Sequence, residues 1–192
     1  SKVYKLIMKI LVIQNRMGIG DTVIFLPYIQ KISEKFNTPI YLLVKKSSKA
    51  DQFLCHTEYI NKIIFLDRDS KKVGRHDGVM GSLRLVQDLK KFKFNKVFIF
   101  NSSLRYNIIT RLSGIKEIYQ YPLFKKQNQL INKPAIDLIK KKLNLDVNNN
   151  PKIEIDRNLE KLAIAKYDID KNKLNILLAI GGSGSTKRIP SK

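Results

Sequence analysis

One acidic residue, Asp21, lies in a short segment whose composition suits a ligand-binding turn. Residues 15–22 read Asn-Arg-Met-Gly-Ile-Gly-Asp-Thr and follow the apolar run at residues 10–13. A helical pattern of apolar residues comes next, over residues 22–36. A buried strand, a glycine turn and a helix N-terminus in succession form the usual ligand-binding place of α/β proteins. A carboxylate there goes beyond what phosphate binding requires, so it suggests proton-transfer chemistry.

Two roles for Asp21 are open from the residues alone. In the first, Asp21 caps the helix or lies in its first turn, where the helix dipole favours a negative charge. In the second, Asp21 is a general base that faces a crevice and is kept ionised by the same helix N-terminus. Gly18 and Gly20 would let a substrate approach the backbone closely. Thr22 and Arg16 could add contacts to it.

The elements that would position this turn alternate along the chain. The apolar runs predict strands at residues 9–14, 40–44, 60–66, 97–100 and 117–120. The intervening patterns predict helices at residues 22–36, 47–55, 83–92, 104–113 and 134–143. These strands are apolar on both faces, which is typical of a parallel sheet covered by helices. Right-handed crossovers then predict a Rossmann-like α/β domain over residues 1–150.

A shorter second part follows a polar, asparagine-rich joint at residues 147–151. We expect a helix at residues 158–166 and a new buried strand at residues 174–180, which runs into a second glycine-rich turn. A strand and a ligand-type loop without a following helix form an incomplete unit. The sequence therefore predicts that residues 151–192 are a linker and the start of a second domain, and that the chain is the N-terminal portion of a longer protein.

The charge balance favours anionic partners. The chain has 37 Lys and Arg against 16 Asp and Glu, a formal net charge of +21 and a pI near 10.0. Such a field attracts nucleic acid, phospholipid surfaces or phosphorylated small molecules. The lysines are scattered, so a compositional bias of the genome is an alternative source of the charge. A nucleic-acid partner is disfavoured because no aromatic-rich RNA-binding stretch is present.

Several other classes of protein are also disfavoured. Cys55 is the single cysteine, so no disulfide framework or cysteine zinc site is possible, and a cytoplasmic location is expected. Val23 replaces the third glycine of the dinucleotide fingerprint, and Lys45 follows the second strand where an acid would bind a ribose. We therefore expect no nicotinamide or other cofactor. We also expect no metal, because no carboxylate cluster lies near either histidine, His56 or His76. No signal peptide or membrane-spanning stretch is evident.

Three segments together resemble the heptosyltransferase family, glycosyltransferase family nine. Residues 10–36, with Met-Gly-Ile-Gly-Asp-Thr inside them, resemble the start of that family. Asn-Ser-Ser-Leu-Arg at residues 101–105 resembles its Ser-Leu-Arg segment. Residues 181–190 resemble its interdomain loop, which ends in Lys-Arg-Trp-Pro; here Ile189 replaces the tryptophan. The three segments occur in the family's order and span nearly the whole chain.

The resemblance implies the N-terminal half of a GT-B glycosyltransferase, in which two Rossmann-like domains face each other across a cleft. Members of the family transfer heptose from ADP-heptose to the inner core of lipopolysaccharide, with inversion and without a metal. The resemblance makes Asp21 the base that deprotonates the acceptor hydroxyl. It also places four residues of the second glycine-rich loop near the donor diphosphate: Ser183, Ser185, Thr186 and Lys187. Hydroxyls and an ammonium group suit a departing diphosphate, although a flexible linker is the alternative for this loop.

The acceptor is expected at the carboxyl ends of the first-domain strands. The resemblance implies a lipid-linked, anionic acceptor, whose phosphates and carboxylates suit basic side chains. The candidate acceptor-binding residues are Gly18, Gly20, Thr22, Arg68, Lys71, Lys72, Arg75 and Arg105. Solvated surface positions are the alternative for the charged ones. A lipid-linked acceptor would also bring the protein to the cytoplasmic face of the inner membrane as a peripheral protein.

Two other functions are compatible with these residues. The first is a GT-B glycosyltransferase with a different sugar donor. The second is a non-catalytic basic module that binds RNA or an anionic membrane, with an affinity that falls steeply with salt. Under the leading hypothesis, the 192-residue chain should fold alone and have little or no activity.

Overall fold

The computed structural model describes residues 8–68, 73–123 and 130–178. Contacts divide the chain into a first unit, residues 1–154, and a second unit, residues 155–192, and each is considered by itself. The first unit is built on a parallel sheet of five strands in the order β3-β2-β1-β4-β5. The strands are β1 (Ile10–Gln14), β2 (Ile40–Lys45), β3 (Ile60–Leu66), β4 (Lys96–Ile99) and β5 (Glu117–Gln120). This arrangement confirms the predicted Rossmann-like α/β fold.

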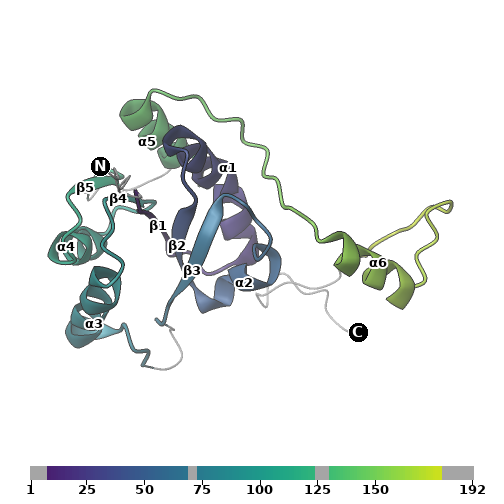
Figure 1. Cartoon of the computed structure of the whole chain (residues 1–192), viewed down its shortest axis with the longest axis horizontal. Helices are drawn as coiled ribbons and strands as arrows, with labels where there is room; N and C mark the ends of the chain where they lie inside the picture. The colour runs from purple at the N-terminus through teal and green to yellow at the C-terminus, as the bar shows by residue number, and fades with distance from the viewer. Residues whose placement is uncertain (1–7, 69–72, 124–129, 179–192) are drawn as a thin grey trace, which may run out of the picture. The chain divides into compact units, whose positions relative to one another are not determined.

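Helices cover both faces of the sheet (Figure 1). On one face lie α1 (Ile19–Phe36) and α5 (Lys133–Leu143), and on the other lie α3 (Gly78–Lys90) and α4 (Leu104–Leu112). A short helix, α2 (Ala50–Phe53), follows β2 after a single 3-10 turn at Lys46–Ser48. The chain therefore forms three layers, with the sheet in the middle.

The central strand shows why this sheet needs a cover on both faces. All five residues of β1 are buried. Ile10 and Val12 pack into the core beneath α1 and α5, whereas Leu11 and Ile13 pack into the core beneath α3 and α4. Because successive side chains of a strand point to opposite faces, a strand that is apolar throughout can be buried only between two helical layers.

Aromatic packing fixes α1 against the carboxyl ends of the strands. The ring of Phe25 stacks on Phe100 at 5.3 Å between centroids, and Tyr28 meets both rings edge-on. Phe100 in turn stacks on Tyr121, which follows β5. The helix continues through Pro27, which is buried in this layer. The packing therefore holds the N-terminus of α1 in one position despite the hydrogen bond that proline removes.

Three helices differ by more than one residue from the sequence-based expectation. The helix expected from residue 22 begins at Ile19, so Pro27 lies in its interior. The helix expected from residue 83 begins more than one turn earlier, at Gly78. Glycine has a low helix propensity, which hides this start in the sequence. The predicted helix at residues 47–55 is reduced to the 3-10 turn and α2.

The second unit holds one described helix, α6 (Arg157–Lys166). Asp156 caps it, because one carboxylate oxygen accepts from the backbone N–H of Asn158 at 2.7 Å and of Leu159 at 3.4 Å. The expected strand at residues 174–180 is not formed over residues 174–178, which are exposed and have no ladder partner among the described residues. An apolar run becomes a strand only when a neighbouring strand pairs with it. Whether residues 151–192 begin a donor-binding domain stays a prediction.

Candidate functional site

The strand order places a crevice beside the first turn. The chain adds β2 and β3 on one side of β1 and then crosses to β4 on the other side, so the order reverses between β1 and β4. Loops diverge at such a point, and ligands of open α/β sheets bind there. The two loops are bridged at their base, because the side-chain amide of Asn101 donates to the side-chain oxygen of Asn15 at 3.3 Å.

Asp21 lies in the first turn of α1, at the edge of this crevice. Its Oδ2 accepts a hydrogen bond from the backbone N–H of Gly18, the N-cap residue, at 3.2 Å. Its Oδ1 makes no hydrogen bond with any residue in the described ranges. Asp21 is partly exposed. One oxygen therefore holds the helix start while the other remains able to accept a proton, which allows both sequence-based roles at once.

The two glycines of the turn differ in the space around them. A Cβ on Gly18 would lie 3.1 Å from Oδ2 of Asp21, whereas a Cβ on Gly20 would meet no atom within 4 Å. Gly18 has an extended backbone, with φ −90° and ψ 156°, that any residue can adopt. The absence of a side chain at residue 18 therefore gives room to the Asp21 carboxylate rather than conformational freedom to the chain.

Gly18→Ala and Gly20→Ala form a matched pair that tests this difference. We expect Gly18→Ala to displace the Asp21 carboxylate. Under the hypothesis that Asp21 is a general base, turnover of the intact protein should then fall by about tenfold, because a small misplacement of a reacting group is costly. Gly20→Ala should leave the free energy of unfolding within about 0.5 kcal/mol or raise it, since alanine favours helix. If a substrate packs on the open Gly20 backbone, Gly20→Ala raises the KM for the acceptor. Equal effects of the two substitutions on turnover would contradict this assignment.

Thr22 is less available to a ligand than its sequence position suggests. The residue is fully buried, and its hydroxyl donates to the carbonyl of Gly18 at 3.3 Å. The backbone N–H of Thr22 donates to the same carbonyl. Thr22 therefore closes the turn in the present structure, and its contact with an acceptor stays a prediction.

Two buried polar groups at the same edge of the sheet were missed by the sequence analysis. Gln14 ends β1 and is 1% exposed; its Oε1 accepts from the backbone N–H of Arg16 at 3.0 Å. Its Nε2 and the hydroxyl of Tyr121 are buried without a hydrogen-bond partner among the described residues. Burial raises the pKa of the Tyr121 hydroxyl, and the nearby charge of Arg16 offsets part of that rise. The one signal for Gln14 was a polar residue directly after an apolar run.

A pocket of about 340 Å³ lies beside the Asp21 turn, at the carboxyl ends of β2 and β3. Its lining residues are Met17, Lys45, Lys46, Ser47, Phe65, Leu66, Asp67 and Arg68. Three cations and one carboxylate therefore surround a partly apolar floor. Met17 belongs to the same turn as Gly18, so the pocket opens next to the crevice. A pocket of this charge suits a phosphate or carboxylate of a sugar-sized ligand.

Arg68 and Arg105 come together at the far side of this pocket. The Nε of Arg68 lies 3.3 Å from a carboxylate oxygen of Asp77, the N-cap residue of α3. The guanidinium of Arg105 donates to the backbone carbonyl of His76, while its Nε is buried without a partner in the described part of the chain. Burial and the charge of Arg68 lower the pKa of Arg105. The guanidinium groups of Arg68 and Arg105 are thus close together, and the Nε of Arg105 can still donate a hydrogen bond.

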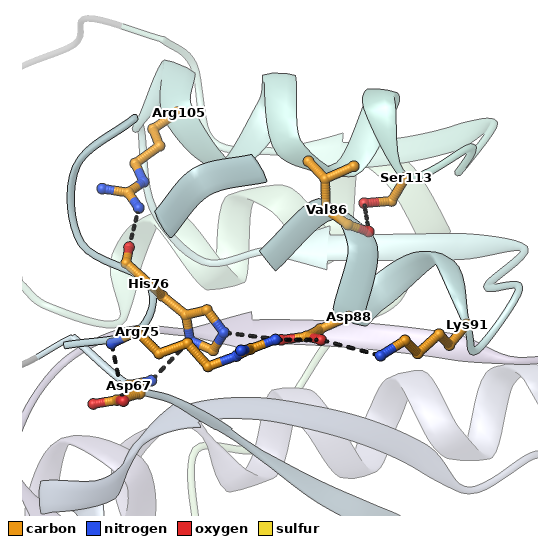
Figure 2. Close-up of polar contacts among 8 residues, drawn as sticks. All are labelled: Asp67, Arg75, His76, Val86, Asp88, Lys91, Arg105 and Ser113. Atoms are coloured by element: carbon orange, nitrogen blue, oxygen red, sulfur yellow. Dashed lines mark hydrogen bonds and ion pairs between the residues drawn. The ribbon is translucent and has the colours of Figure 1, made fainter. Parts of the chain in front are cut away.

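Arg75 points elsewhere, into an ionic network on α3 (Figure 2). Its Nε and Nη2 donate to the carboxylate of Asp88 at 3.1 and 3.0 Å. The backbone N–H of Asp67 donates to Nδ1 of the buried His76 at 3.0 Å, so the proton of the neutral ring lies on Nε2, which faces Asp88 at 3.2 Å. Lys91 completes the network at 3.4 Å. This network ties the β3–α3 loop to the helix, and an acceptor-binding role for Arg75 stays a prediction.

The Asp88 network gives a pH-dependent contribution to stability. Burial by itself raises the pKa of Asp88, but hydrogen bonds from His76 and Arg75 outweigh it, and the pKa lies below its ordinary value of 3.8. The folded protein therefore binds this proton less readily than the unfolded chain. The stabilisation is present above pH 3.8 and is lost as the pH falls through the folded-state pKa.

We expect Asp88→Asn to lower the free energy of unfolding by about 1–2 kcal/mol at neutral pH, because it removes the charge from these hydrogen bonds. Urea unfolding of the wild-type protein and the variant across acidic pH measures this difference. The two curves should converge below pH 3.8. A difference that stays constant down to the lowest pH would show that the charge of Asp88 is not the source.

The remaining predicted site residues lie outside the described residues. They are Lys71, Lys72, Ser183, Ser185, Thr186 and Lys187. Within the described ranges, no group of three or more His, Cys, Asp and Glu side chains is arranged to hold a metal ion. The structure thus places Gly18, Gly20 and Asp21 beside Met17, which lines one pocket with Lys45, Lys46 and Arg68. Arg105 lies near Arg68, and Arg75 is directed to α3.

The chain is similar in fold to several solved structures. No protein-family model and no curated protein matches the chain. Among solved structures, a glycosyl transferase family 9 protein from Veillonella parvula DSM 2008 is 15% identical with a TM-score of 0.73, over 95% of this chain and 56% of that one. ADP-heptose lps heptosyltransferase II of E. coli is 11% identical with a TM-score of 0.62, over 85% of this chain and 52% of that one. The E. coli heptosyltransferase WaaC with ADP-2-deoxy-2-fluoro heptose is 12% identical with a TM-score of 0.50, over 80% and 53%.

These likenesses concern the backbone, since the sequence identities are low. The chain spans about half the length of each of these solved structures. The resemblance predicted from three short segments is therefore confirmed at the level of the fold. Over its own length, the chain has the Rossmann-like α/β fold of one half of a GT-B, family-nine glycosyltransferase.

Proposed function

We propose that this chain is the acceptor-side half of a glycosyltransferase that uses a nucleotide sugar. The observation that carries the proposal is Asp21, a first-turn carboxylate with one oxygen on the N-cap N–H and one oxygen without a described partner, at the switch point of this fold. Glycosyl transfer to a hydroxyl needs a base at this kind of position. The likeness to a family-nine glycosyltransferase and to heptosyltransferases supports the same class.

In the proposed mechanism, the acceptor hydroxyl lies against Oδ1 of Asp21. Asp21 takes the proton as the hydroxyl oxygen attacks the anomeric carbon from the face opposite the nucleotide. The new C–O bond forms as the bond to the diphosphate breaks, so the configuration inverts. The hydrogen bond from the backbone N–H of Gly18 to Oδ2 would hold the carboxylate toward the crevice while Oδ1 takes the proton.

The pocket beside Asp21 is the proposed acceptor site. Lys45, Lys46 and Arg68 would bind phosphates or carboxylates of a lipid-linked acceptor, while Met17 and Phe65 would contact its sugar faces. Arg105 on α4 lies near Arg68 and would add a second guanidinium group. This assignment extends the predicted acceptor set by two lysines, Lys45 at the end of β2 and Lys46 directly after it. The predicted roles of Lys71 and Lys72 belong to the same proposal.

The donor half of the proposal rests on the sequence motif and on the solved structures. We propose ADP-heptose as the donor, because the E. coli neighbours are described as an ADP-heptose lps heptosyltransferase and as WaaC with an ADP-heptose analogue. Ser183, Ser185, Thr186 and Lys187 would bind its diphosphate and stabilise the leaving group without a metal. The protein would then work in the cytoplasm, at the inner face of the membrane that holds the acceptor.

Transfer by the intact protein, including any residues encoded beyond Lys192, tests the proposal directly. The purified protein is mixed with ADP-heptose and an inner-core acceptor, and ADP release and product mass are measured. NMR of the new linkage reports inversion, and an excess of chelator should leave the rate unchanged. Transfer from another nucleotide sugar alone would redirect the proposal to a different donor. Salt-sensitive RNA or vesicle binding without any transfer would favour the non-catalytic alternative.

A further inference from the structure

The outer faces of α3 and α4 carry aliphatic side chains that nothing in the described structure covers. The exposed ones are Val79, Met80, Leu83, Leu104, Ile108 and Leu112, which we call the α3–α4 outer face. The side chains of Val79 and Leu83 lie one turn apart on α3, and Leu104, Ile108 and Leu112 form a second row on α4. Each helix also has a complete buried face against the sheet. These residues are therefore not needed for the core.

The two helices are neighbours and run in the same direction. The hydroxyl of Ser113, the C-cap of α4, donates to the backbone carbonyl of Val86 on α3 at 3.3 Å, and the helices lie side by side on one face of the sheet (Figures 1 and 2). Both follow a parallel strand, so both begin at the carboxyl edge of the sheet. The aliphatic positions nearest their N-termini, Val79 and Leu104, therefore lie toward the edge that carries Asp21.

Basic residues outnumber acidic ones around this surface. Residues 78–116 contain eight Lys and Arg and one acidic residue, Asp88, which is already paired with Arg75 and Lys91. The opposite face is basic too, because α5 has four Lys and one Asp while α1 has two basic and two acidic residues. The α3–α4 outer face differs from α5 because exposed aliphatic side chains lie beside its basic residues. Such a surface complements a partner that is both anionic and apolar.

The chemistry of these side chains favours a lipid surface over nucleic acid. All six exposed residues are aliphatic, whereas the aromatic residues of segment 78–116 are buried or partly buried and offer no free ring for base stacking. Aliphatic side chains on the outside of a helix, with basic residues around them, insert into the boundary between headgroups and acyl chains. Within the described part of the chain, no helix is long and apolar enough to cross a membrane.

We propose that the α3–α4 outer face docks on an anionic phospholipid bilayer. Aliphatic residues of the two helices enter the headgroup region, and Arg84, Arg111 and their basic neighbours bind lipid phosphates. This docking deepens the proposed function, because it would turn the carboxyl edge of the sheet toward a lipid-linked acceptor. Binding itself requires neither donor nor acceptor, so it can be tested separately from transfer.

Flotation of the intact protein with vesicles tests the docking surface. We expect binding to an equal mixture of phosphatidylcholine and phosphatidylglycerol and little binding to phosphatidylcholine alone. The combined change Val79→Ser, Leu83→Ser and Ile108→Ser should lower the partition coefficient by about tenfold, since it removes inserted apolar surface. Leu130→Ser is the matched control; Leu130 is as exposed as Val79 but lies just before α5. Equal losses for the triple variant and the control would overturn the proposal.

A charge-matched pair separates docking from general attraction by a basic protein. Arg84→Gln with Arg111→Gln should lower partitioning by about fivefold per charge, because basic residues near an anionic surface contribute about 1 kcal/mol each. Lys141→Gln with Lys142→Gln removes the same charge from exposed positions of α5 and should cost less than about twofold. Equal effects of the two pairs would mean non-directional electrostatics and would overturn the proposal.

The single cysteine makes an orientation test possible. In a Cys55→Ser background, Leu83→Cys carries an environment-sensitive fluorophore, and Leu130→Cys carries it in a second sample. Mixing with phosphatidylglycerol vesicles should shift the emission of the first sample to the blue and leave the second unchanged. The reverse result, or no shift in either sample, would contradict insertion by this face. All of these readouts are independent of catalysis, so they hold even if the donor or the reaction has been assigned incorrectly.

Discussion

Asp21→Asn is expected to reduce turnover of the proposed transferase by at least about 10²-fold, and up to about 10⁴-fold, because it removes the proposed general base. The amide oxygen of asparagine can still accept the hydrogen bond from Gly18, so the helix start should survive. Loss of the interaction with the helix dipole costs about 0.3–1 kcal/mol of stability. Steady-state kinetics should therefore show a collapse of kcat, with little change in the KM of the acceptor.

The control for Asp21→Asn is a second first-turn acid. Asp51 lies in the first turn of α2, is exposed and does not line the acceptor pocket. Asp51→Asn should leave kcat within about twofold of the wild-type value, since it removes a dipole interaction but no base. If Asp21→Asn behaved like Asp51→Asn, Asp21 would be a helix cap alone. Unfolding curves of both variants show whether a loss of activity comes from a loss of folded protein.

Gly81→Ala is expected to destabilise the protein by about 3 kcal/mol, near the upper end for overpacking. A Cβ on Gly81 would lie 2.2 Å from the backbone carbonyl carbon of His76 and 2.7 Å from its Cα. Backbone atoms cannot move aside as a flexible side chain can, so α3 or the β3–α3 loop must shift. In an exposed helix the same substitution would add about 1 kcal/mol of stability. The contact with His76 therefore turns the expected stabilisation by Gly81→Ala into a destabilisation.

Gly20→Ala provides the comparison for this stability effect. Both glycines lie near the start of a helix, but residue 20 has open space where residue 81 meets backbone. Urea unfolding should show a large loss for Gly81→Ala and none for Gly20→Ala. Hydrogen exchange should locate the damage, because the backbone N–H of His76 donates to the carbonyl of Asp67 at 2.9 Å and should lose protection first. A Gly81→Ala protein as stable as the wild type would show that the loop and α3 are not packed as described.

Asp21 and the Arg68–Arg105 pair form the two sides of the proposed site. Asp21 depends on a turn between adjacent elements, whereas Arg68 and Arg105 depend on how the β3–α3 loop packs against α3 and α4. Because the carbonyl of His76 accepts from Arg105, a displaced His76 backbone would also release that guanidinium. Gly81→Ala should therefore raise the KM for an anionic acceptor in addition to lowering stability.

Local residue patterns were enough to predict the five strands, their parallel arrangement and the turn that carries Asp21. Each of these depends on neighbours in sequence: an apolar run buried on both faces, glycines in a turn and a carboxylate at a helix start. The order of the strands, and with it the switch point between β1 and β4, was not predicted and comes from the structure. The general location of the candidate site was nevertheless encoded locally.

Contacts between distant residues were decided only by the tertiary structure. Arg75 belongs to a basic loop in the sequence, yet the fold pairs it with Asp88, thirteen residues later. Lys45 ends β2 and Arg68 follows β3, and the pairing of these two strands brings both residues to one pocket. The start of α3 at Gly78 depends on the space that Gly81 leaves for the backbone of His76. The apolar residues 174–178 form no strand, because pairing needs a partner strand that a local pattern cannot supply. The sequence by itself determined which elements form and where the carboxylate lies, while partner choice, pocket lining and one helix boundary depend on packing between segments far apart in the chain.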